Sequence, residues 1–360
     1  MYETRTYEES LNSQKKKIYV DCRTPKEYEH STIIGAVNIP ILLNEEREKI
    51  GTLYVNAETE EAKKTGIAFV SKRLPDIFEK ILNLKKECDE LYFFCSRGGY
   101  RSTAIVSLLT GLDEKVYKLY GGYKSYRNYI VKSLPELINS VHYITLLGYT
   151  GTGKTSVLKN LRKMGYNILD LEHFANHRGS LLGQVGKTEQ NSQKKFEASL
   201  FQELEKYKDS YAFIEGESSK IGNVVLPKSL TQKMDSGTKI LIDASLKFRV
   251  EEIKSVYLPD FAGDTEFMIK SIEKLQRYIS SERMKSYKDM IAKGDFDRLL
   301  GDLCVKYYDL NYNIPKDGYY KTYLNDCSQD TAEKIAEDFK NFIDNFKSAG
   351  SQSVSQQSAD

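Results

Sequence analysis

The stretch GYTGTGKT, residues 148–155, restricts the fold of this chain more than any other feature. A glycine, four residues and then Gly-Lys-Thr is the spacing of a phosphate-binding loop, and here it lies between the apolar run HYITLLG and the helix-forming run SVLKNLRKM. Glycines let backbone amides turn toward phosphate oxygens, and the following helix presents its positive dipole end to the same charge. We predict a phosphate site at Gly148, Thr150, Gly151, Thr152, Gly153, Lys154 and Thr155, with a ligand-free glycine turn as the alternative.

Acidic residues close the apolar runs around this loop. Asp170 ends YNILD, Glu215 and Glu217 end YAFIEGE, and Asp243 ends KILID. The carboxyl ends of parallel strands collect the ligand of a doubly wound sheet, so these side chains are expected near the phosphate loop. Within the loop, the lysine is placed to bridge terminal phosphates and the last threonine to bind Mg²⁺. One carboxylate is expected to order that ion through water, although a solvated strand end is the alternative for each.

Apolar runs alternate with helix-forming segments along most of the chain, a pattern typical of parallel sheets. IYVDCR and ELYFFC are predicted strands, RSTAIVSLLTGL is a predicted helix, and Pro135 is a predicted break before the second series begins. We predict an α/β protein with two parallel-sheet domains, residues 10–138 and 139–347. The second carries a helical segment around 246–309, and the Ser- and Gln-rich residues 348–360 form a disordered tail.

Composition excludes several classes of protein. A chain of 360 residues can bury two cores, and a net charge of +2 excludes a strongly basic protein that wraps nucleic acid, so any RNA contact must be local. Five cysteines without CxxC spacing fit a reducing compartment. The N-terminus lacks a signal-peptide core, and no apolar run approaches the roughly 20 residues that cross a bilayer. We expect a cytoplasmic protein without a membrane segment.

A second loop, CSRGGYRS at residues 95–102, follows the predicted strand ELYFF. The helix expected to begin near Arg101 directs free amides at the sulfur of Cys95, and Arg97 adds positive charge, so the thiolate is favoured. A buried apolar cysteine is the structural alternative. Cysteine-dependent phosphatases share this spacing of cysteine and arginine, but Phe94 stands where those enzymes usually have histidine.

The stretch DCRTPKEYEHSTIIGAVNIP, residues 21–40, resembles the opening signature of rhodanese domains. A rhodanese unit fused to a phosphate-loop unit is uncommon, and the chain from about residue 18 to 347 resembles the tRNA 2-selenouridine synthase family. The motifs that carry the resemblance are PILLNEEREKIGTLY, CSRGGYRS, LYGGYKSYR, GYTGTGKT, DLEHFANHRGSLLG and EGESSKIG. One departure is Ser219, where this family is expected to have arginine.

The resemblance implies a transferase that replaces the sulfur of wobble 2-thiouridine in tRNA with selenium from selenophosphate. It also implies an S-geranyl intermediate made from geranyl diphosphate, which turns a poor sulfur leaving group into a better one. Cys95 is expected to accept or position selenium with Arg97 and Arg101, and Lys154 and Thr155 are expected to hold the diphosphate. An enzyme that produces selenophosphate is an expected partner.

The resemblance also assigns residues around the phosphate loop to the active site. His173 and His177 lie four residues apart, but no third ligand is placed to complete a zinc site, so we expect them to contact diphosphate or tRNA instead. The supporting acidic and polar residues are Asp170, Glu172, His177, Arg178, Glu215, Glu217 and Ser218.

The run MIKSIEKLQRYISSERMKSYKDMIAK, residues 268–293, is the candidate tRNA contact. A basic helical face with interleaved tyrosines can follow an RNA backbone, whereas a solvated amphipathic helix is the alternative. The residues concerned are Lys270, Lys274, Arg277, Arg283, Lys285 and Lys288. Two other functions stay open from the residues: a cysteine phosphatase with an accessory nucleotide domain, and a nucleotide-regulated sulfur carrier that binds a protein partner.

Overall fold

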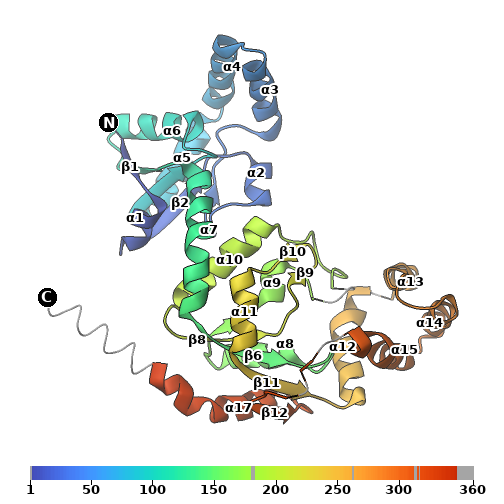
Figure 1. Ribbon diagram of the computed structural model, residues 1–360. Helices are drawn as coiled ribbons and strands as arrows, with labels where there is room; N and C mark the ends of the chain where they lie inside the picture. The colour runs from blue at the N-terminus through green and yellow to red at the C-terminus, as the bar shows by residue number, and fades with distance from the viewer. Residues whose placement is uncertain (1, 180–182, 262, 312–313, 316, 347–360) are drawn as a thin grey trace. The chain divides into compact units, whose positions relative to one another are not determined.

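The computed structural model describes residues 2–179, 183–261, 263–311, 314–315 and 317–346. The predicted tail at 348–360 lies outside these residues. The chain forms two compact units, Met1–Leu134 with Glu197–Ser199, and Pro135–Phe196 with Leu200–Asp360. Each unit contains a parallel five-stranded sheet, which confirms the α/β fold with two parallel-sheet domains (Figure 1).

The sheet of the first unit has the strand order β1-β5-β4-β2-β3, with every neighbouring pair parallel. Its strands are β1 (Glu3–Arg5), β2 (Lys17–Asp21), β3 (Val37–Asn38), β4 (Glu90–Phe94) and β5 (Tyr117–Leu119). Every residue of central β4 is buried, as expected for a strand covered on both faces. The helices are α1 (Tyr7–Asn12), α2 (Pro25–His30), α3 (Asn44–Val55), α4 (Thr59–Ser71), α5 (Leu74–Lys85), α6 (Tyr100–Gly111) and the first part of α7 (Gly122–Ser140).

The motif at residues 21–40 is structural. The buried Arg23 guanidinium donates to Asp21 at 2.6 Å and to the Ser31 carbonyl at 2.6 Å. The Asn38 amide donates to the backbone carbonyls of residues 21 and 23. Thr24 caps α2 in a capping box with Glu27, which satisfies donors at the helix start. These bonds hold the loops after β2 and before β3 in fixed positions.

The sheet of the second unit has the order β12-β11-β6-β8-β7, again all parallel. Its strands are β6 (His142–Leu147), β7 (Ile168–Leu169), β8 (Tyr211–Glu215), β11 (Thr238–Asp243) and β12 (Lys321–Leu324), and a separate antiparallel pair is formed by β9 (Lys220–Ile221) and β10 (Val224–Val225). Helices α8 (Lys154–Lys163), α9 (Leu171–Ala175), α10 (Gln193–Lys206), α11 (Lys228–Ser236) and α17 (Ser328–Asp338) belong to this unit. The core contains Ile144, Phe213 and Ile240 from three adjacent strands.

The helical segment of the second unit contains α12 (Leu246–Phe261), α13 (Thr265–Glu273), α14 (Ser281–Lys293), α15 (Phe296–Leu303), the π-helix η1 (Cys304–Tyr308) and α16 (Asp309–Asn311). Leu275, Tyr287 and Leu303 are buried in an apolar cluster of its own. Contrary to the expected break at Pro135, α7 continues through this residue to Ser140. In the described part of the chain, no helix combines the length and apolar character that spanning a bilayer requires.

Candidate functional site

The phosphate loop connects β6 to α8, as its motif predicts. Gly151 and Gly153 both have φ of +82°, a left-handed conformation that favours glycine. A Cβ on Gly153 would lie 2.4 Å from the Asn325 amide nitrogen, and one on Gly151 would lie 2.8 Å from the Arg249 carbonyl oxygen. The loop is therefore packed too tightly at these positions for any larger residue.

The polar side chains of the loop meet the end of β8. Lys154 is 5% exposed, and its Nζ donates to the Gly148 carbonyl at 2.9 Å and lies 3.5 Å from a Glu215 carboxylate oxygen. The Thr155 hydroxyl donates to Glu215 at 2.9 Å. The structure thus brings together the lysine, the threonine and one of the predicted strand-end carboxylates.

Three carboxylates form the acidic part of the site. One oxygen each of Glu172, Glu215 and Glu217 lies within 4.8 Å of the other two. Burial, followed by repulsion from Glu215, raises the pKa of Glu172 and that of Glu217. Gly179 has φ of +68°, which favours glycine, and a Cβ there would lie 2.8 Å from an oxygen of Glu172 and 2.8 Å from one of Glu217, so a larger residue would displace these carboxylates.

This cluster suits a divalent cation. Mg²⁺ prefers oxygen ligands, and three carboxylates beside a phosphate loop and a threonine hydroxyl supply them. Burial is the largest cause of the two raised pKa values, and a bound cation would relieve the repulsion from Glu215 that adds to it. Glu172, Glu215, Glu217 and Thr155 are the residues that would hold it.

The other predicted residues have distinct positions around this cluster. Asp170 caps α9 by accepting a hydrogen bond from the His173 amide at 2.9 Å. His177 is 7% exposed, and among the described residues its Nδ1 has no hydrogen-bond partner, while burial lowers its pKa. Arg178 pairs with Asp260 at 2.6 Å. Ser218 is exposed and its hydroxyl donates to the backbone carbonyl of residue 220.

Most of these residues line one cavity of about 970 Å³ in the second unit. It is lined by Thr150, Gly151, Gly153, Lys154, Thr155, Asp170, Glu172, His173, His177, Arg178, Gly179, Glu215, Glu217 and Ser218, among others. Asp243 is absent from this lining; its side chain accepts a hydrogen bond from the amide of Ala244. The sequence therefore identified many of the residues that line the cavity, although Gly148 and Thr152 of the phosphate loop are not among them.

The cysteine loop lies in the first unit, between β4 and α6. Cys95 is 3% exposed and belongs to the apolar core of the unit. Its sulfur accepts a hydrogen bond from the buried Ser102 hydroxyl at 3.2 Å and lies 3.7 Å from the Gly99 carbonyl oxygen. A Cβ on Gly122 would lie 2.2 Å from the Cys95 carbonyl oxygen. The Gly-Gly turn after β5 therefore packs directly against the backbone of the cysteine loop. The sulfur therefore has little contact with solvent in this conformation.

The arginines of this loop differ in their surroundings. Arg101 donates to the Glu27 carboxylate at 2.5 Å and to the Ser96 hydroxyl at 3.1 Å. Burial opposes ionisation of Glu27, but the hydrogen bond and charge of Arg101 lower its pKa to about 2. Arg97 is exposed. Ser102, which the prediction did not list, is the side chain that donates to the sulfur.

The predicted tRNA contact is divided between two helices and a turn. Lys270 lies on α13 and pairs with Glu266, while Lys288 on α14 pairs with Glu273. Lys274, Arg277 and Lys285 are exposed, and Arg283 is half-buried. The run is thus not one helix with one basic face.

Two residues that sequence reasoning missed hold the phosphate loop. The buried Arg249 donates to the Thr150 carbonyl at 2.8 Å and to both oxygens of Asp309. The Asn325 amide donates to the Thr152 carbonyl at 2.7 Å. Neither belongs to a motif, and each lies far from residues 148–155 in sequence, so periodicity and spacing offered no signal.

The fold and the two loops define the class of this protein: a rhodanese-like unit joined in one chain to a phosphate-loop unit. The family model described as the tRNA 2-selenouridine synthase AAA domain matches residues 141–342, and the rhodanese-like domain model matches residues 4–129. The chain belongs to the tRNA 2-selenouridine synthase family.

Individual relatives that carry the family's name agree with this assignment. A tRNA 2-selenouridine synthase of Nitrosomonas eutropha is 33% identical over 246 residues, which cover 66% of this chain and 62% of that protein. One of Pseudomonas fluorescens is 31% identical over 297 residues, covering 76% of this chain and 78% of that protein. The crystal structure of the N-terminal domain of a putative ATP/GTP binding protein from Clostridium difficile 630 has 40% identity, covers 36% of this chain and 99% of that one, and gives a TM-score of 0.35.

Proposed function

We propose that this protein converts wobble 2-thiouridine in tRNA to 2-selenouridine, with geranyl diphosphate and selenophosphate as co-substrates. The observation that carries the proposal is the phosphate loop of the second unit beside three clustered carboxylates, in a chain that also carries a cysteine loop. Relatives that match both units carry the name tRNA 2-selenouridine synthase. Such a reaction takes place in the cytoplasm, where tRNA is modified.

The first step is assigned to the second unit. The thiocarbonyl sulfur attacks C1 of geranyl diphosphate, a C–S bond forms, the C–O bond breaks, and diphosphate leaves while the base gives up its N3 proton. Lys154 and the loop amides stabilise the charge that develops on the departing diphosphate. Mg²⁺, when bound by the carboxylates, neutralises further charge on the same group. Glu172 or Glu217 can accept the proton, because each lies at the cluster that faces the cavity.

The second step is assigned to the cysteine loop. Selenium of selenophosphate attacks C2 of the base, geranylthiol leaves, and water cleaves the Se–P bond to give phosphate. Of the two roles considered for Cys95, positioning of the selenium donor is the one that balances. Formation of a perselenide on Cys95 from selenophosphate would require a two-electron oxidant, and its delivery to the base as selenide would require a reductant, whereas a positioned selenophosphate requires neither.

The remaining partners follow from the same chemistry. Contact with tRNA is proposed for the exposed residues Lys274, Arg277 and Lys285, and for Arg283. Lys270 pairs with an acidic neighbour, so its charge is partly neutralised. A selenophosphate-producing enzyme is proposed as the supplier of the second co-substrate.

The test is anaerobic incubation of the full chain with thiolated tRNA, geranyl diphosphate, Mg²⁺ and selenophosphate, followed by analysis of the nucleosides. Wild-type protein should give 2-selenouridine, and omission of selenophosphate should leave S-geranyl-2-thiouridine. Lys154→Ala should remove the geranylated nucleoside. Cys95→Ala should remove selenouridine and leave the geranylated nucleoside in place.

Three results would contradict this proposal. Equal loss of both products in Cys95→Ala would oppose the division of steps between the loops. ATP hydrolysis that geranyl diphosphate does not inhibit would assign the phosphate loop to a nucleotide. Turnover of an aryl phosphate that depends on Cys95 would indicate a phosphatase instead.

A further inference from the structure

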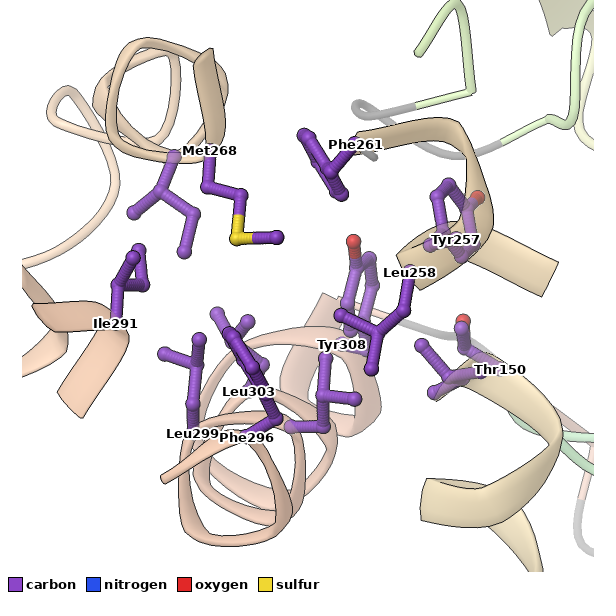
Figure 2. Close-up of a pocket in the computed structure, with 13 residues that line it drawn as sticks. Thr150, Tyr257, Leu258, Phe261, Met268, Ile291, Phe296, Leu299, Leu303 and Tyr308 are labelled. Carbon is purple, nitrogen blue, oxygen red and sulfur yellow. The ribbon is translucent and has the colours of Figure 1, made fainter. Parts of the chain in front are cut away.

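A narrow apolar slot opens among the helices of the second unit. It has a volume of about 50 Å³ and is lined by side chains from α12, α13, α14, α15 and η1. Figure 2 shows Met268, Phe261, Leu299 and Leu303 projecting toward a common centre, with Thr150 and Tyr257 at one side. All of its lining residues except Thr150, Tyr257 and Tyr308 are purely hydrocarbon or thioether side chains.

The slot adjoins the phosphate cavity. Thr150, Ile253, Tyr257 and Tyr308 line both. Thr150 belongs to the phosphate loop itself, so the slot begins within the loop that is built to hold an anion. A ligand that reaches both spaces must combine a phosphate head with an apolar tail.

We propose that this slot binds the hydrocarbon tail of a prenyl diphosphate whose head lies on the phosphate loop, and that the slot selects the length of that tail. The inference rests on the proposed function for the choice of a prenyl tail over another hydrocarbon. It adds the place of the tail, the residues around it and the property that they control. A nucleotide is disfavoured, because the two tyrosine hydroxyls and one threonine offer little for reading a base.

The volume indicates how much of the tail the slot holds. A cavity that binds benzene measures about 150 Å³, roughly three times the present slot. A ten-carbon chain therefore cannot lie wholly inside. Its first isoprene unit is expected in the wide cavity beside Ile253 and Tyr257, and the end of its second unit at the slot, which the unbranched Met268 side chain can enlarge by turning aside.

The slot is not a void enclosed within the hydrophobic core. Tyr257, Leu258, Phe296, Leu300 and Tyr308 are only partly buried where they pack against the core of the helical segment. Apolar side chains that border an open cavity expose surface to water, and a hydrocarbon ligand covers that surface.

The test measures the binding of inorganic pyrophosphate and of dimethylallyl, geranyl and farnesyl diphosphates to the full chain with Mg²⁺, without tRNA or selenophosphate. Geranyl diphosphate should bind at least about tenfold more tightly than the dimethylallyl compound, since a pocket discriminates about that much for even one methylene. Leu300→Phe should fill the slot and bring this ratio toward one, with pyrophosphate affinity unchanged. Met268→Ala should widen it and raise the relative affinity for the farnesyl compound about tenfold.

Val305→Phe is the matched control, because Val305 is 49% exposed on η1 and does not line the slot. Thermal unfolding shows whether each variant is folded. A diazirine-bearing geranyl diphosphate should label peptides of α12, α13 or α15 in the wild-type protein. Labelling confined to other segments, or chain-length ratios that neither slot variant alters, would overturn the inference.

The two proposals fail in different ways. If prenyl diphosphates bind with the expected length preference but tRNA is never geranylated, the slot stands and the proposed function falls. If tRNA is geranylated and selenated, yet slot variants discriminate chain lengths like the wild-type protein, the function stands and the slot falls.

Discussion

Replacing Glu217 by glutamine should stabilise the second unit at pH 8. Carboxylate oxygens of Glu172, Glu215 and Glu217 lie within 4.8 Å of one another. Two full charges at that separation repel by about 3.5 kcal/mol at an effective dielectric constant of about 20. Glu172 and Glu217 are half-buried, so water screens part of this repulsion. We expect a gain of about 1–2 kcal/mol in the free energy of unfolding.

The direction of the pH dependence follows from the raised pKa of Glu217, whose ordinary value is 4.5. Above pH 4.5 the unfolded chain releases this proton while the folded protein keeps it, so folding binds a proton. The associated stability is complete below pH 4.5 and is lost as the pH rises through the raised folded-state pKa. Glutamine does not ionise, so Glu217→Gln removes this part of the loss. The gain should be absent near pH 5 and present at pH 8.

Hydrogen exchange of the β6 and β8 amides in the full chain reports unfolding of this sheet alone. At pH 8, exchange in Glu217→Gln should be about five to thirty times slower than in the wild-type protein, the factor that corresponds to 1–2 kcal/mol. Glu205→Gln, on the exposed face of α10, is the matched control and should change nothing. Equal protection of Glu217→Gln and wild type at pH 8, or the same gain in the control, would refute the reasoning.

Three further predictions concern glycine conformation, the ion pair of Glu27 and the candidate tRNA contact. Gly122 has φ of +59°, and Gly122→Ala would place a Cβ 2.2 Å from a carbonyl oxygen, so it should lower the free energy of unfolding by about 2 kcal/mol or more. Gly35 has φ of +78° but no atom within 4 Å of an added Cβ. Gly35→Ala should therefore lower the free energy of unfolding by only about 1 kcal/mol. Thermal melts compare the two. Glu27→Gln should cost about 2 kcal/mol at pH 7. Because the pKa of Glu27 is lowered to about 2, the stability it contributes is present above pH 4.5 and lost as the pH falls, so this difference should shrink in urea unfolding at pH 3. Charge reversal at Arg277 and Lys285 should weaken tRNA binding and reduce its salt dependence. Filter binding measures the tRNA affinity at several salt concentrations. Affinities equal to those of the wild type at every concentration would show that these residues are ordinary solvated side chains.

Much of the fold could be predicted, because its signals are local. The apolar runs that became β4 and β6 are continuous, and each is followed by a glycine-containing loop, which identifies buried parallel strands without knowledge of their neighbours. β1 was missed, and the first domain was predicted to begin at residue 10. The sequence Glu3–Arg5 has no apolar pattern, since this strand lies at the sheet edge and is fixed by backbone pairing with β5.

The same contrast between local signals and long-range contacts applies to the site. Lys154, Thr155 and Glu215 could be predicted to converge because strand ends of one parallel sheet meet at one edge. The division of residues 268–293 was not foreseen, since a capping serine at 280 looks like any other polar residue in a lysine-rich run. The burial of Cys95 corresponds to the alternative that the sequence left open, because the loop spacing reports the backbone around a sulfur and does not indicate which side chains cover it.

The buried Arg249 links the phosphate loop to the helices that line the apolar slot. Its planar guanidinium donates to the carbonyl of Thr150 in the phosphate loop and to both oxygens of Asp309, which follows directly after η1 at the wall of the slot. Lysine has a single side-chain nitrogen and cannot reproduce the planar contact in which two nitrogens each donate to one oxygen of Asp309. Because one planar group links the loop proposed to hold a diphosphate and the helices proposed to surround its tail, it restrains the distance between the phosphate loop and the slot. A restrained distance of this kind lets a site distinguish prenyl chains by length as well as by apolar character.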